Sequence, residues 1–119
     1  MRLAFWVALV MAAPASAQPL DCSDRSAMVQ IELNACAAQD WERWDALLNI
    51  VYQRVLASGR VEEEGLRQAQ RAWITYRDLT CEMEAGQALG GTIAPLYHAN
   101  CLARLTQRRT EDIETYLLN

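Results

Sequence analysis

The ten residues Ala69–Asp78, AQRAWITYRD, concentrate large and hydrogen-bonding side chains on one predicted helix. They include a Trp, a Tyr, two Arg, an Asp and a Gln, and Cys81 follows three residues later. Trp73 and Arg77 are four residues apart, so they share one helix face and the guanidinium can lie over the indole. A helix with these side chains must pack against other elements and satisfy its polar groups there.

The acceptors for Arg77 are expected from a second helix, in Asp45 and Asn49, and from Asp78. We expect a partly buried polar network that sets the register of the helices, because buried Arg and Asp residues are retained only when they are paired. Its predicted members are Asp45, Asn49, Gln70, Trp73, Arg77 and Asp78. The alternative interpretation makes Trp73, Tyr76 and Arg77 a binding hot spot, since Trp, Tyr and Arg dominate such sites. The structural interpretation is favoured because the same residues lie on the apolar stripe of their helix.

The apolar spacing predicts an all-α bundle of one short helix followed by three longer antiparallel helices. The short helix is expected over residues 26–38, and Asp40 is the predicted N-cap of the next. Apolar residues step by threes and fours along each longer helix. The three stripes are Trp41, Trp44, Leu48, Val51 and Val55; Leu66, Ala69, Trp73, Tyr76, Thr80 and Met83; and Leu102, Leu105, Ile113, Tyr116 and Leu117. No stretch alternates with period two, so strands are not expected.

Glycines, acids and a proline mark the expected helix ends. Gly59 should close the second helix in a left-handed conformation. The acids at 62–64 should occupy the first turn of the next helix, where negative charge meets the positive end of the dipole. The candidate binding loop that follows contains Gly86, Gly90, Gly91 and Thr92. Thr92 is expected to cap the last helix, with Pro95 in its first turn.

Residues 1–17 have the form of a cleaved signal peptide, with Arg2, an uncharged apolar run and small residues ending at Ala17. The run is too short to span a bilayer comfortably. No lipid anchor is expected on Cys22, because the residues before it do not form a lipobox. Cleavage leaves 102 residues, 18–119, which suffice for a single domain.

The cysteines of the mature part are Cys22, Cys36, Cys81 and Cys101. An even number of cysteines in a small exported chain predicts two disulfides, since that compartment is oxidising. Four cysteines can pair in three ways, and the sequence does not decide among them. The short loop after Gly86 favours a Cys81–Cys101 bond across a helical hairpin. The remaining pair, Cys22–Cys36, would then attach the lead segment, residues 18–25, to the first helix.

The net charge of the chain limits the classes of partner molecule that it suits. All eleven basic residues are Arg, and the ten that remain after cleavage face fifteen acids, a net charge near −5. An acidic domain without a basic cluster is poorly suited to nucleic acid or an anionic membrane, and it suits a basic partner. His98, the single histidine, has no CxxC pair nearby and no nucleophile beside it. Neither a metal, a cofactor nor catalysis is therefore expected.

An ordered set of positions runs through the mature chain. It comprises Cys22, Cys36, residues 45–49, Tyr52, residues 69–73, residues 76–78, Cys81, residues 90–92, Cys101, Leu102, Leu105, Thr106 and Arg109. This set resembles the LprI-type lysozyme inhibitor N-terminal domain family over nearly the whole mature chain. The resemblance implies a small exported helical domain from a family that is mostly of unknown function and is named after a mycobacterial lipoprotein that inhibits lysozyme. Unlike that founder, this chain is expected to have neither a lipobox nor the additional C-terminal region that such proteins can carry.

Two functions are therefore considered. The first is a protein-binding module of the cell envelope, with lysozyme inhibition as its sharpest form and a basic protein such as lysozyme as the partner. The alternative is a non-catalytic small-molecule-binding or structural accessory protein of the periplasm, using a crevice near Trp41, Trp44 and Trp73. The oligomeric state does not follow from the sequence.

Overall fold

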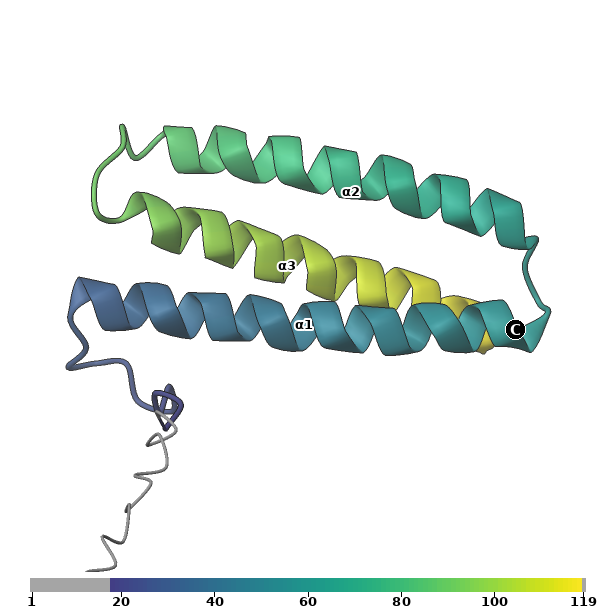
Figure 1. Ribbon diagram of the computed structural model, residues 1–119, viewed down its shortest axis with the longest axis horizontal. Helices are drawn as coiled ribbons and strands as arrows, with labels where there is room; N and C mark the ends of the chain where they lie inside the picture. The colour runs from purple at the N-terminus through teal and green to yellow at the C-terminus, as the bar shows by residue number, and fades with distance from the viewer. Residues whose placement is uncertain (1–17, 119) are drawn as a thin grey trace, which may run out of the picture.

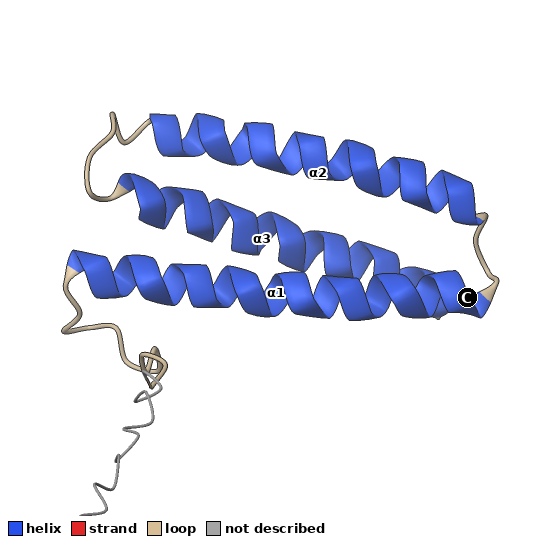
Figure 2. Ribbon diagram, in the orientation of Figure 1, coloured by secondary structure: helices blue, strands red, loops and turns tan. Residues whose placement is uncertain are grey.

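Three long antiparallel helices form the domain in a computed structural model that describes residues 18–118 (Figure 1). They are α1 (Gln30–Ser58), α2 (Glu63–Gly86) and α3 (Ala94–Glu114), and a 3₁₀ turn, η1 (Thr115–Leu117), follows α3. In Figure 1, α3 runs between the other two helices. Figure 2 shows only helix and loop over the described part of the chain, which confirms the all-α prediction there. The predicted signal peptide, residues 1–17, lies outside the described residues.

Helix α1 is continuous over 29 residues, so the prediction of a separate short helix over residues 26–38 is wrong. The sequence around Asp40 contains neither glycine nor proline, and its alanines favour the helix. Asp40 is not an N-cap but lies inside α1, where its carboxylate is 2.8 Å from Arg25 Nη2 and 3.0 Å from Arg43 Nη2. An aspartate engaged by two guanidinium groups does not compete for backbone N–H groups, and the helix continues through it.

The turn between α1 and α2 follows the predicted signals. Gly59 ends α1 with φ of 66°, a left-handed conformation that glycine adopts without steric cost. Glu62 is the N-cap of α2, and its carboxylate accepts the backbone N–H groups of Glu64 and Gly65. These bonds satisfy donors that have no partner inside the helix.

The start of α3 differs from the prediction. Ile93, not Thr92, is the N-cap, and no side chain caps the helix. The carbonyl of Thr92 instead accepts a hydrogen bond from Asn34 Nδ2 of α1 at 3.1 Å, which turns this residue toward α1. Pro95 lies in the first turn as predicted, where its missing N–H costs nothing.

Two clusters of buried side chains hold the helices together. The cluster near the α1–α2 turn contains Leu48, Val51, Val55, Leu66 and Ile113, with Tyr52, Leu56, Val61, Trp73 and Leu117 packed against it. The cluster toward the α2–α3 loop contains Cys81, Cys101, Leu102 and Leu105, with Trp41 packed against it. Of the stripe predicted for α1, Leu48, Val51 and Val55 are buried and Trp41 packs against a cluster. Trp44 is only partly buried and belongs to neither cluster. On α3 the predicted stripe is buried as far as Ile113, and the polar Thr106 is fully buried among it.

Half of the residues predicted to form the apolar stripe of α2 are exposed. Leu66 is buried and Trp73 is partly buried. The exposed members are Ala69, Tyr76 and Met83. Apolar residues surround much of this helix, and α2 packs mainly against α3, so part of its apolar surface remains outside. The inward face at mid-helix carries Arg77, whose side chain is only 11% exposed.

The structure joins Cys22 to Cys36 and Cys81 to Cys101, the two pairs favoured from the sequence. The first bond holds the lead segment against α1, and the second holds α2 against α3. Both bonds lie at the end of the bundle that carries the α2–α3 loop. A small domain closed by two disulfides is typical of proteins that fold outside the cytoplasm. Over residues 18–118, none of the helices is both long and apolar enough to cross a membrane.

Replacing both Cys81 and Cys101 by Ser should lower the free energy of unfolding by about 3 kcal/mol, because the bond closes a 20-residue separation in the unfolded chain. Chemical denaturation of the two oxidised proteins, followed by circular dichroism, measures the difference. The matched control replaces Cys22 and Cys36 by Ser. We expect it to cost less, because that bond closes 14 residues and joins no two helices. Equal stability of the Cys81/Cys101 variant and the parent contradicts this role.

Candidate functional site

Two guanidinium groups lie against Trp73. The Cζ atom of Arg77 is 5.1 Å from the centroid of the indole, and that of Arg109 is 6.0 Å from it. Arg109 comes from α3, so the indole and its two cations connect α2 to α3. Cation–π contacts of this kind contribute about 0.5–1 kcal/mol at exposed sites and more when they are desolvated.

Arg77 is the buried member of the predicted polar network. Its Nε and Nη2 atoms are both 2.8 Å from Asp78 Oδ1, and its Nη1 atom is 4.0 Å from Asp45 Oδ1. The two carboxylates are 49% and 44% exposed, so water screens both ion pairs. The network therefore neutralises one largely buried cation at the edge of the core and contributes little through the ion pairs themselves.

Within residues 18–118, neither Gln70 nor Asn49 is hydrogen-bonded to Arg77. Gln70 Oε1 accepts a hydrogen bond from Arg109 Nε at 3.0 Å. Asn49 is exposed on α1 and lines a hollow of about 310 Å³ between α1 and α2. In the sequence Arg109 looks like an interruption of an apolar stripe. Its position four residues from both Leu105 and Ile113 is the signal that it faces inward.

The three tryptophans of the described chain lie in different surroundings. Trp41 packs against the cluster around Cys81, and its Nε1 atom is buried without a hydrogen-bond partner among residues 18–118. Trp73 packs against the other cluster. Trp44 lines a hollow of about 260 Å³ with Arg43 and Leu47. These positions do not make one crevice of the three indoles.

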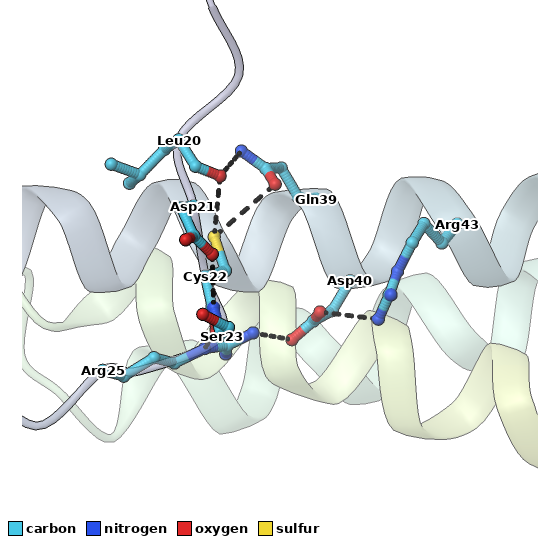
Figure 3. A pocket seen from close by; sticks show the side chains of 8 residues that line it. All are labelled: Leu20, Asp21, Cys22, Ser23, Arg25, Gln39, Asp40 and Arg43. Atoms are coloured by element: carbon cyan, nitrogen blue, oxygen red, sulfur yellow. Dashed lines mark hydrogen bonds and ion pairs between the residues drawn. The ribbon is translucent and has the colours of Figure 1, made fainter.

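A polar hollow of about 340 Å³ lies where the lead segment meets α1 (Figure 3). It is lined by Leu20, Asp21, Cys22, Ser23, Arg25, Gln39, Asp40 and Arg43. The two arginines both bind Asp40, and Gln39 Nε2 donates to the carbonyl of Leu20 at 3.5 Å. The backbone N–H of Ser23 lowers the pKa of Asp21 by hydrogen bonding to its carboxylate. Arg25 pairs with Asp40 of α1, and Asp21 accepts a backbone hydrogen bond from Ser23, so the polar groups of this hollow hold the lead segment against α1.

The α2–α3 loop, residues 87–93, presents Leu89 to solvent. Leu89 and Gly90 both have positive φ, 50° and 72°, and the Leu89 side chain is 94% exposed. Leucine rarely adopts this left-handed conformation. Backbone hydrogen bonds from Leu89 N to Gly86 O at 3.1 Å and from Gly91 N to Ala88 O at 3.0 Å hold the turn. Backbone strain that the surroundings maintain is common in segments that bind ligands or partners.

The same end of the bundle exposes further apolar side chains. We call this region the loop-end surface, and its apolar members are Val29, Ile31, Leu89, Ile93 and Tyr97. A hollow of about 420 Å³ lies within it, lined by Gln30, Ile31, Asn34, Thr92 and Pro95. The bond from Asn34 to the Thr92 carbonyl ties the loop to α1 across this hollow. Both disulfides join elements at this end of the bundle.

Groups that could perform chemistry are sparse over residues 18–118. All four cysteines are in disulfides. No set of three or more His, Cys, Asp or Glu residues in the described part of the chain is arranged to hold a metal ion. His98 is partly buried on α3. The loop-end surface combines exposed apolar side chains with a tethered loop, and we take it as the candidate site.

Replacing Arg77 by Ala should destabilise the protein by more than replacing Asp45, because Arg77 also loses its packing on Trp73. We expect a coupling of about 0.5 kcal/mol between the two positions, the value of a pair at the solvent edge. Unfolding of both single variants and the double variant in denaturant measures it. Arg71→Ala is the control on the same helix, because this 65% exposed side chain forms an ion pair with Glu64 of the same helix. A loss for Arg77→Ala no larger than that of the control contradicts the buried role.

Comparison with known proteins places these features in a family. Residues 22–113 match the family described as Lysozyme inhibitor LprI. An uncharacterized protein of Rhizobium meliloti (strain 1021) is 38% identical over 120 residues, covering 89% of this chain and 86% of the relative. No solved structure matches. The matched range contains both disulfides, the arginines at Trp73 and the α2–α3 loop, and the chain belongs to the LprI lysozyme inhibitor family.

Proposed function

We propose that this chain is an exported, non-catalytic protein-binding module of the cell envelope that inhibits a lysozyme through its loop-end surface. The exposed Leu89, held at positive φ on a tethered loop, is the observation that carries the proposal. Family membership supports a lysozyme as the target enzyme, because the family is described as a lysozyme inhibitor. The two disulfides support a periplasmic or secreted location, where such bonds persist.

An inhibitor must bind its enzyme without losing much conformational entropy. The loop meets this requirement, since its backbone hydrogen bonds, the Asn34 contact and the Cys81–Cys101 bond hold it before a partner arrives. Leu89 then provides an apolar group that can enter a cleft of the enzyme. The hollow beside Ile31 and Pro95 can accept a side chain in return.

The charge of the chain favours a basic enzyme. The whole sequence carries fifteen acidic and eleven basic residues, so a positively charged lysozyme experiences a net attraction. Such complementarity mainly increases the rate of association and is reduced by salt. The apolar loop-end surface supplies the contacts that slow dissociation.

The direct test is the residual activity of hen-type and goose-type lysozymes on peptidoglycan, titrated with the exported, oxidised protein. We expect activity to fall with increasing inhibitor and to reach a plateau near equal molar amounts. No inhibition at a large molar excess contradicts the proposal for those two enzymes.

Leu89→Asp should weaken inhibition by roughly 30-fold or more, the effect of removing an interface hot spot. Aspartate tolerates a left-handed backbone better than leucine, so a loss of inhibition does not report a misfolded loop. Leu47→Asp is the matched control, because Leu47 is an exposed leucine in the middle of α1. Equal inhibition by both variants shows that the loop is not the contact.

A further inference from the structure

The outer face of α2 carries an exposed stripe with coiled-coil spacing. Its members follow one another at alternating steps of four and three residues, and they are Gly65, Ala69, Ala72, Tyr76, Leu79, Met83 and Gly86. All seven are exposed, and the three large side chains are 58%, 62% and 62% exposed in chain order. A helix with this spacing presents one continuous seam to a partner helix. Because all seven residues are exposed, no other helix covers this seam within the described residues.

One half of the seam consists of small residues, and the other half has large side chains; we call them the small half and the large half. Its N-terminal half contains Gly65, Ala69 and Ala72, and its C-terminal half contains Tyr76, Leu79 and Met83. A hollow of about 400 Å³ opens beside the small half, and Gly65, Ala69, Arg109 and Tyr116 are among the residues that line it. The face therefore combines a ridge on α2 with a depression between α2 and the C-terminal end of α3.

We propose that two copies of this chain form a dimer through these faces, with their α2 helices antiparallel about a two-fold axis. In that register Gly65 meets Met83 of the partner subunit, Ala69 meets Leu79 of the partner subunit, and Ala72 meets Tyr76 of the partner subunit. Each large side chain then lies opposite a small one, which is the condition for close packing between helices. A two-fold axis repeats every contact, as an isologous interface requires. A parallel pair instead sets large residues against large ones and small against small.

Polar residues beside the seam agree with this register. Glu82 borders the large half and Gln68 borders the small half, on the flank away from α3. Residues at such flanking positions face each other across helix pairs, so Glu82 of one copy lies near Gln68 of the other. Glu82 is exposed and forms no ion pair within residues 18–118, which leaves its carboxylate available.

The dimer goes beyond the proposed inhibitory function and does not depend on it. Because α2 ends at the α2–α3 loop, an antiparallel pair places the two loop-end surfaces at opposite ends of the assembly. Neither surface is covered, and each copy remains able to bind.

Sedimentation equilibrium of the exported, oxidised protein over a range of concentrations tests the proposal. We expect a monomer–dimer equilibrium that Leu79→Glu shifts to monomer. Ile50→Glu is the control, because Ile50 is half-exposed on α1, away from the seam, and this variant should retain the dimer. Circular dichroism and the midpoint of thermal unfolding show that both variants fold. A monomeric parent at every concentration, or a dimer that Leu79→Glu leaves intact, overturns the proposal.

A charge exchange tests the register. Gln68→Glu should raise the dimer dissociation constant by roughly fivefold, since the two-fold axis places two pairs of like charges at the interface. Adding Glu82→Arg should restore the parental dissociation constant or lower it further. These two positions are 14 residues apart, about 21 Å along one helix, so the rescue cannot arise within a single chain. Failure of the second substitution to restore association overturns the antiparallel register.

Discussion

The disulfide between Cys81 and Cys101 is the constraint on which the loop end of the molecule depends. Cys81 is the single residue that α2 contributes to the buried cluster at that end, whereas Leu66 and Trp73 anchor α2 at the other end. Apolar packing of these side chains holds α2 to the bundle at one end, and the covalent bond, together with the Arg104–Glu84 ion pair, does so at the other. A domain of this size buries a limited core, and a cross-link compensates where the apolar contacts are few.

The middle of α2 is fixed by a different interaction. Arg77 and Arg109 lie against Trp73, and their hydrogen bonds to Asp78 and Gln70 orient the guanidinium planes. The indole thus packs against apolar side chains on one side and carries cations as well. The segment AQRAWITYRD is rich in residue types that usually mark binding sites. Those of its residues that face inward instead serve the packing of α2 on α3.

The same helix has a second, outward role. Tyr76 belongs to the quoted segment but lies on the exposed seam with Leu79 and Met83. The segment therefore includes both the inward contacts of the fold and part of the face that we assign to self-association. The α2–α3 loop, held by the disulfide and by Asn34, is a third region, and it belongs to the surface that we propose binds the enzyme. One rigid bundle can in this way present separate surfaces to a copy of itself and to a partner enzyme.

The sequence by itself determined the helical class, the glycine turn at Gly59 and the loop after Gly86, because these depend on local spacing and turn chemistry. It favoured the two observed disulfide pairs but did not decide among the three possible pairings. The prediction of an N-cap at Asp40 failed because an aspartate can either cap a helix or lie within one. The ion pair with Arg25 decides between the two, and it is a tertiary contact. The prediction also failed for half of the α2 stripe, because steps of three and four occur on two faces of that helix. Only the tertiary structure decided which face α3 covers, that Arg109 joins Trp73, and that Leu89 protrudes at positive φ, because each depends on residues distant in the chain or on a backbone conformation that leucine rarely adopts.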